Sequence, residues 1–232
     1  MIVATGRSYA KRSGKRCRSP APHPLPPGSG LRPWGARRAR NSLVVLRQPG
    51  ERSLADVGIL PRQTMLTPRV EVRLPVESDR ERFVELFCDE SFMVFSAGVL
   101  DSDSAHRRFD EMLERAAELP FAKQPVIERR TGSIIGYSGV NSFEFEEQRR
   151  LEYGYRLVPE ARGKGYATEA SRALLTLAEQ TFSGEILAMI DPRNTASQNV
   201  ARKLGFAFWK QAVVDGFLDN LYRLQLGTAG AL

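Results

Sequence analysis

Residues 157–170 decide the fold, and they have the sequence LVPEARGKGYATEA. An apolar, strand-like run leads into a loop with two glycines, and a helix begins directly behind that loop. The N-terminus of a helix leaves backbone N–H groups unpaired and carries a partial positive charge. Because glycine lets the backbone approach an anion closely, Gly163 and Gly165 predict a cradle for a phosphate group, beside the charges of Arg162 and Lys164. A tight turn that binds nothing is the alternative that this loop alone leaves open.

Two common phosphate loops do not match this stretch. The chain contains no Gly-x-x-x-x-Gly-Lys-Ser/Thr string of the kind that nucleoside triphosphatases use. The dinucleotide pattern Gly-x-Gly-x-x-Gly fails because Thr168 stands where the third glycine belongs. The strands expected upstream also look antiparallel, whereas a dinucleotide fold needs β-α-β units.

Hydrophobic patterning outward from this loop predicts an α+β protein with a mixed sheet. A capping box at Ser78-Asp79-Arg80-Glu81 predicts that a helix begins there. Asp215-Gly216 predicts the turn of a hairpin between residues 206–214 and 217–226. Further strands are expected at residues 70–76, 125–127, 134–140, 151–158 and 185–190, and further helices at 103–119, 165–182 and 195–204.

The distribution of charged residues and of prolines changes near Met65 and divides the chain into two parts. Residues 1–64 carry 13 Lys and Arg against 2 Asp and Glu, a net charge of +11, while the remaining residues carry 21 against 25, a net charge of −4. Eight of the 14 prolines also lie in residues 1–64, and such density opposes helices and sheets. We therefore expect a disordered basic arm over residues 1–64 and one folded domain over residues 65–232.

Three other interpretations of the arm stay open. It could be an organelle transit peptide, a segment that binds nucleic acid, or an over-extended gene product whose translation begins at Met65. The absence of an apolar secretory segment near Met1 and the wide spacing of Cys17 and Cys88 favour a reducing cytoplasm.

Several function classes find no support in the residues. The longest apolar runs, such as Ile186 to Ile190, fall far short of the roughly 20 residues of a membrane span. His23 and His106 have no cysteine or carboxylate at metal-site spacing, so no metal is expected. No Gly-x-Ser-x-Gly string supports a serine hydrolase.

The pattern Arg162-x-x-Gly165-x-Ala167 resembles the signature of the GNAT superfamily of acyl-CoA-dependent N-acetyltransferases. Residues 152–157 (EYGYRL) resemble the family's strand before that loop, and residues 194–206 (NTASQNVARKLGF) resemble a later helix. The most similar branch is that of the ribosomal-protein N-terminal acetyltransferases. The resemblance covers about Met65 to Leu226.

This resemblance implies a GNAT fold, a mixed and mostly antiparallel sheet with helices on both faces. It implies acetyl-CoA as cosubstrate, with its diphosphate on the loop amides and its pantetheine arm beside the preceding strand, whose edge a bulge would open. Gly154 fits such a bulge or a close backbone approach, and a role in packing alone is the alternative. The cofactor-binding residues expected on this basis are Tyr155, Arg156, Leu157, Val158, Arg162, Gly163, Lys164, Gly165, Tyr166, Ala167 and Asn194.

Two residues are expected to carry the chemistry. Glu152 is the candidate base, although a glutamate with pKa about 4.3 needs a raised pKa or a water relay to act near neutrality. Many relatives have a tyrosine acid where this chain has Ala201, so Ser197 is the candidate donor to the leaving sulfur. A solvated strand glutamate, a plain first-turn serine and an Asn194 that only caps its helix are the alternatives.

The expected reaction is acetyl transfer from acetyl-CoA to an amine, either a protein N-terminal α-amine or a small molecule. Deprotonating an α-amine at pH 7 costs about 1 kcal/mol against about 4–5 kcal/mol for a lysine, which favours an amine of low pKa. The rival functions are a non-catalytic acyl-CoA-binding module and nucleic-acid binding through the basic arm. No membrane partner is expected, and the protein is expected to be a monomer or a homodimer.

Overall fold

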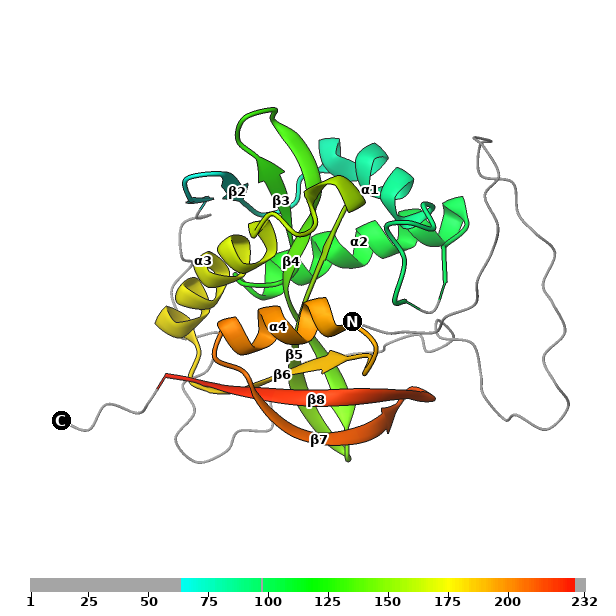
Figure 1. The fold of residues 1–232 in the computed structure, drawn as a ribbon. Coiled ribbons are helices and arrows are strands. Elements are labelled where there is room, and N and C mark those ends of the chain that lie inside the picture. The colour runs from blue at the N-terminus through cyan, green and yellow to red at the C-terminus, as the bar shows by residue number, and fades with distance from the viewer. Residues whose placement is uncertain (1–63, 97, 228–232) are drawn as a thin grey trace, which may run out of the picture.

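The computed structural model describes residues 64–96 and 98–227, so the expected arm lies outside the described residues except for Thr64. Figure 1 shows a central sheet between helices. The strands are β1 (Met65–Leu66), β2 (Val70–Val72), β3 (Gln124–Glu128), β4 (Ser133–Phe145), β5 (Gln148–Leu157), β6 (Gly184–Ile190), β7 (Ala207–Val214) and β8 (Phe217–Leu226). The helices are η1 (Glu77–Asp79), α1 (Arg80–Phe87), α2 (Ser102–Glu118), η2 (Pro159–Ala161), α3 (Tyr166–Thr181) and α4 (Thr195–Lys203).

The eight strands form one sheet in the order β1-β2-β3-β4-β5-β6-β8-β7. Every neighbouring pair is antiparallel except β5 and β6, which are parallel. Helix α3 connects these two strands, as a parallel pair requires a crossover. The expected mixed, mostly antiparallel sheet is confirmed.

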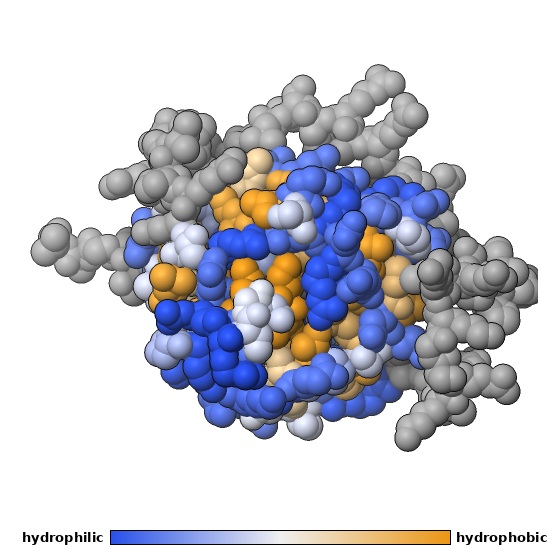
Figure 2. Space-filling model, turned by 90° about the horizontal axis from the view of Figure 1, so that it is seen from above, coloured by the Kyte–Doolittle hydropathy of each residue, from blue (hydrophilic) through white to orange (hydrophobic). Residues whose placement is uncertain are grey.

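Helices cover both faces of the sheet, as expected. Side chains of α3 such as Leu174 pack on one face, against Val140 and Tyr153 of the central strands. Side chains of α1 and α2 pack on the other face, where Phe83 and Phe109 meet Tyr137. Hydrophilic residues cover much of the surface seen in Figure 2, and apolar residues show between them toward its middle.

A bulge in β4 allows one strand to serve both layers. The register between β3 and β4 shifts between Val126 and Ile127, opposite Gly136 and Ile134. As a result Ile135 packs on the α3 side and Tyr137 on the α1–α2 side, although residues two apart in a regular strand share a face. Gly136 is required there, because its φ is +150° and a Cβ would lie 1.9 Å from the carbonyl oxygen of Arg156.

The parallel pair of β5 and β6 is short, and this opens the sheet at its centre. The two strands pair only at Leu151 with Ile186 and at Glu152 with Leu187. Beyond these residues β5 runs on to Leu157 and β6 to Ile190 without pairing to each other. A wedge between the two strands is therefore built into the sheet.

The segment before α1 differs from the expectation. Strand β2 ends at Val72, and η1 precedes α1, so neither the strand to residue 76 nor the capping box of Ser78 is present. Instead the carboxylate of Asp79 accepts from the N–H of Val76 (3.0 Å) and from both terminal nitrogens of Arg73 (2.7 and 2.8 Å). These contacts turn the chain before the helix begins.

No helix in the described ranges has the length and apolar character that a membrane crossing requires.

Replacing Leu174 tests the packing of α3 on the sheet. Leu174 is fully buried (0% exposed), so Leu174→Ala should lower the free energy of unfolding by about 2–5 kcal/mol in urea denaturation. Leu218→Ala makes the same change at an exposed site (52%) and should cost much less. Equal losses in the two variants would contradict the assignment of Leu174 to the core.

Candidate functional site

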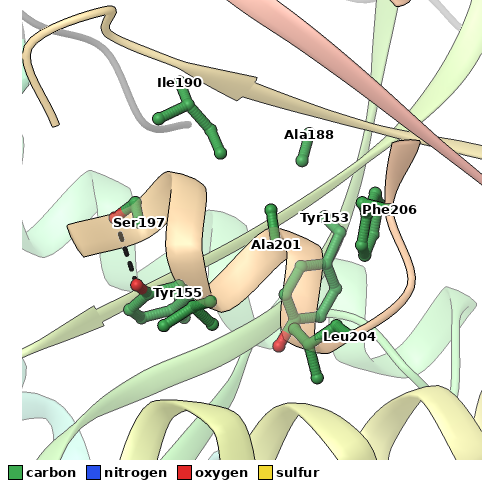
Figure 3. A pocket seen from close by; sticks show the side chains of 9 residues that line it. Tyr153, Tyr155, Ala188, Ile190, Ser197, Ala201, Leu204 and Phe206 are labelled. Atoms are coloured by element: carbon green, nitrogen blue, oxygen red, sulfur yellow. Dashed lines mark hydrogen bonds between the residues drawn. The ribbon is translucent and has the colours of Figure 1, made fainter. Parts of the chain in front are cut away.

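A pocket lies in the wedge where β5 and β6 part, and α4 forms its third wall (Figure 3). Its lining is mostly apolar, with hydroxyl groups from Tyr155 and Ser197. The complete lining is Tyr153, Tyr155, Ala188, Ile190, Ser197, Val200, Ala201, Leu204 and Phe206. Parts of β5 and α4 that the resemblance singled out therefore meet at one place.

The free edge of β5 offers backbone polar groups to this wedge. The N–H of Val158 donates to Ile135 of β4 (2.9 Å), so by alternation along the strand the N–H groups of Tyr155 and Leu157 point toward the wedge. The carbonyl of Leu157 confirms this direction, because it accepts from Nε of Arg162 (3.0 Å) rather than from β4. An extended ligand chain could pair with this edge.

The edge does not open in the way expected. The register between β4 and β5 runs without a shift through Gly154, which lies opposite Gly139, so the expected bulge at Gly154 is absent from this ladder. The edge is free instead because β6 turns away after Leu187.

The loop before α3 presents a group of unpaired amides. Gly163 (φ +73°) and Gly165 (φ +85°) adopt left-handed conformations, and α3 begins at Tyr166. The first N–H of the helix to bond the backbone is that of Glu169, which donates to the carbonyl of Gly165 (3.1 Å). Within the described ranges, no N–H group of residues 163–168 donates to a backbone carbonyl. This is the geometry of an anion site at a helix N-terminus.

An ion pair from the start of the sheet holds this helix end in place. Glu169 accepts from Thr67 Oγ1 (2.6 Å), from Arg69 N (2.8 Å) and from Arg69 Nε (2.7 Å). Burial raises the pKa of the Glu169 carboxyl, but these hydrogen bonds outweigh it and hold the pKa below its usual value. Arg69 also donates to the carbonyl of Lys164 (2.8 Å), so the loop is fixed from outside the helix.

The side chains of Arg162 and Tyr166 in this loop contact other parts of the protein, unlike the backbone amides. Arg162 donates to the carbonyls of Leu157 and of Ser91 (2.6 Å), so its guanidinium ties the loop to the segment after α1. Tyr166 donates to Glu128 of β3 (2.6 Å) and lies under the Arg69 guanidinium, so it supports the loop from behind. Lys164 is exposed.

Helix α4 brings Ser197 to the wedge. The side chain of Asn194 caps this helix by accepting from the N–H of Ser197 (3.0 Å), as the capping interpretation anticipated. The Ser197 hydroxyl lies 3.1 Å from the hydroxyl of Tyr155 (Figure 3). Burial raises the pKa of Tyr155, although Ser197 and Arg162 lower it, so the phenol keeps its proton at neutral pH.

Glu152 and Arg156 project to the opposite face of β5, toward α1 and α2. Nη1 of Arg156 donates to Sδ of Met93 (2.7 Å), which places this side chain away from the loop amides. Glu152 is 2% exposed, and its carboxylate lies 3.8 Å from Nζ of Lys123. Burial raises the pKa of Glu152, and the charges of Lys123 and Arg108 lower it.

Asp219 of β8 is a residue that sequence reasoning missed. It is 1% exposed, and neither carboxylate oxygen has a hydrogen-bond partner. Burial, Asp191 and Glu152 raise the pKa of Asp219 to about 7. Its position in a hairpin did not indicate a functional role in the sequence, because only the register of the sheet brings it near the carboxylates of Asp191 and Glu152.

Among the residues that the structure describes, no group of three or more His, Cys, Asp and Glu side chains could hold a metal ion.

Comparison with known proteins agrees with this geometry. Residues 69–207 match the family model described as an acetyltransferase (GNAT) domain. The uncharacterized protein YkkB of Bacillus subtilis is 30% identical over 149 residues, which cover 63% of this chain and 86% of YkkB.

Solved structures share the fold. A putative GnaT-family acetyltransferase from Bordetella pertussis superposes with a TM-score of 0.62 at 20% identity, covering 70% of this chain and 99% of its own. A putative ribosomal-protein-serine acetyltransferase from Vibrio cholerae gives 0.58 at 21%, covering 71% and 98%. A putative acetyltransferase, yncA of Salmonella typhimurium, with its cofactor acetyl-CoA, gives 0.55 at 20%, covering 70% and 97%.

The pKa of Asp219 predicts a dependence of stability on pH. Because the folded-state pKa (about 7) lies above the usual value, the folded protein holds this proton more tightly, and stability falls as pH rises from about 4 to about 7. Asp219→Asn removes this titrating carboxyl and with it the loss of stability at high pH. Relative to the wild type, the variant should therefore be more stable at pH 8 than at pH 5, by on the order of 1–2 kcal/mol.

Thermal melting at the two pH values measures the effect. Asp215→Asn makes the same change at an exposed turn residue and should show a much smaller gain, because the Asp215 charge is only a minor cause of the raised pKa of Asp219. An equal shift of the Asp219→Asn variant at pH 5 and pH 8 would contradict the raised pKa.

Proposed function

The chain belongs to the acetyltransferase (GNAT) family, and we propose that it transfers the acetyl group of acetyl-CoA to a primary amine by direct attack of the amine on the thioester. The family match and the acetyl-CoA complex of a protein with the same fold support acetyl-CoA as cosubstrate. We further propose that residues 65–232 form the catalytic domain and that the enzyme works in the cytoplasm.

The observation that carries the proposal is that two suitable features, the loop amides and the free edge of β5, lie beside each other. The unpaired amides of residues 163–168 suit a diphosphate, and the free edge of β5 that leads into this loop suits the amide-containing pantetheine arm. Backbone groups from Tyr155 to Val158 would hold the arm, and the amide of Asn194 has donors left after it caps α4. A tight turn alone does not account for both features.

Acetyl-CoA supplies an activated thioester. The amine nitrogen forms a bond to the carbonyl carbon, the C–S bond breaks, its electron pair goes to sulfur, and the amine loses a proton while sulfur gains one. The N–H groups of Tyr155 and Leu157 point into the wedge and can stabilise the oxyanion, because donors fixed in a water-poor site are the most effective.

Tyr155 and Ser197 are the proposed donors to the departing sulfur. Their hydroxyls are 3.1 Å apart in the pocket that Ala201 also lines, and the Tyr155 phenol keeps its proton. A thiol has a pKa of about 8.5, so the leaving thiolate needs only modest help from a hydrogen bond. A tyrosine at position 201 is therefore not needed.

Glu152 is the proposed acceptor of the amine proton, through a water molecule. The positive charges of Lys123 and Arg108 favour its ionised form, so it acts as a fixed carboxylate that orients the amine and relays its proton. The proposed acceptor is the primary amine of a ribosomal-protein N-terminus, of another protein N-terminus or of a small molecule. A non-catalytic acyl-CoA-binding module would keep the amide cradle and lack turnover with every amine.

Gly165→Glu tests the cradle directly. The change forces a side chain onto a residue with φ +85° and adds a negative charge beside the proposed diphosphate, so isothermal titration should show loss of acetyl-CoA binding. Gly216→Glu makes the same change at the same φ (+85°) in the β7–β8 turn and should bind acetyl-CoA normally. Unchanged affinity in folded Gly165→Glu protein would remove the loop from the proposed site.

Glu152→Gln tests the proton acceptor. The change keeps the shape and removes the charge, so kcat should fall by about 100-fold while the Kd for acetyl-CoA changes little. Glu144→Gln makes the same change at an exposed position of β4 and should have wild-type kcat. A wild-type kcat in Glu152→Gln would show that this carboxylate takes no part in the reaction.

A further inference from the structure

Three carboxylates lie on the face of the sheet opposite α3, with Glu152 at the narrow end of the wedge and Asp191 and Asp219 toward its wide end. Tyr222 of β8 packs on the α3 side, so by alternation Asp219 faces the other way, as Glu152 does on β5. Asn220 lies opposite Ile190 of β6, which places Asp219 beside Asp191. Both Glu152 and Asp191 act electrostatically on Asp219, so the three groups are near one another.

Among the described residues, two of these carboxylates have positive partners and the third, Asp219, has none. Lys123 lies 3.8 Å from Glu152, and Arg193 forms an ion pair with Asp191 at 2.6 Å. In the part of the chain that the structure describes, no Lys or Arg side chain pairs with Asp219 and no donor reaches either of its oxygens. A buried carboxylate without a partner is costly, and this cost suggests that a ligand supplies the missing cation.

We propose that Asp219 binds a second cationic group of the acceptor, so that the preferred substrate carries two positive charges, one on the amine that reacts and one held at β8. This inference rests on the proposed function. It adds that the acceptor is a diamine or a comparable dication rather than a simple monoamine.

The register gives the spacing of the two charges. Glu152 lies opposite Leu187 of β6, and Asp219 lies beside Asp191, the residue that follows β6. Leu187 and Asp191 are four residues apart, which at about 3.3 Å per residue is on the order of 13 Å along the strand. A flexible chain of several bonds can span it, with its reacting amine at Glu152 and its far end at Asp219.

The test compares matched acceptors with the full chain and acetyl-CoA. Straight-chain α,ω-diamines of about four to eight carbons are each compared with their mono-N-acetyl derivatives, which keep the length and one amine but lose the second charge. For the best diamine, wild-type kcat/KM should exceed that of its derivative by at least about tenfold. Asp219→Asn should reduce this ratio to about one, whereas Asp215→Asn should leave it unchanged.

Each outcome has one meaning. Loss of the ratio in Asp219→Asn, with acetyl-CoA affinity and turnover of the mono-N-acetyl amine retained, supports the inference. The inference is overturned, and the proposed function left intact, if the wild-type enzyme acetylates monoamines without preferring diamines. An equal loss of kcat/KM for both acceptors in Asp219→Asn has the same meaning. Absence of acetyl-CoA binding and of turnover with every amine would remove the proposed function itself. Asp219→Glu, which keeps the charge, should retain a preference for diamines even if Asp219→Asn proves unstable.

Discussion

The account depends on the short parallel contact between β5 and β6. Two residue pairs join these strands at their start, and beyond Glu152 and Leu187 each strand continues without the other. Backbone N–H and C=O groups at the centre of a sheet are normally paired, so an unpaired edge here requires another partner. The same divergence makes room for the pocket between β5, β6 and α4.

The two faces of the sheet divide the proposed reaction between them. On the α3 side lie the loop amides, the pocket and the contact of Tyr155 with Ser197, all of which suit the thioester. On the opposite face lie Glu152 and Asp219, which suit a positively charged amine. In the proposed reaction the amine and the thioester approach from opposite faces of the sheet. The raised pKa of Asp219 marks a cost in stability at neutral pH that a purely structural residue would not be expected to carry.

Much of this fold could be predicted from the sequence, because its elements have strong local signals. The helix expected over residues 165–182, the strand expected over 217–226 and the Asp215-Gly216 turn all have their expected places. The glycine loop was also predictable, since two glycines before a helix leave few alternatives. The predictions of a bulge at Gly154 and of a capping role for Ser78 were wrong. The edge of β5 is opened by the divergence of β5 and β6, and the turn before α1 is formed by contacts of Asp79. Asp219 could not be found, since its neighbours come from β5 and β6 and only the register of β8 brings them together.

A crystal structure of the wild-type protein with coenzyme A tests the central claim most directly. The account predicts the diphosphate on the amides of residues 163–168 and the pantetheine arm paired along β5 from Tyr155 toward Leu157, with its thiol in the wedge near Ser197. Coenzyme A bound away from the wedge, or a β6 that pairs with β5 along its whole length and closes the edge, would contradict it.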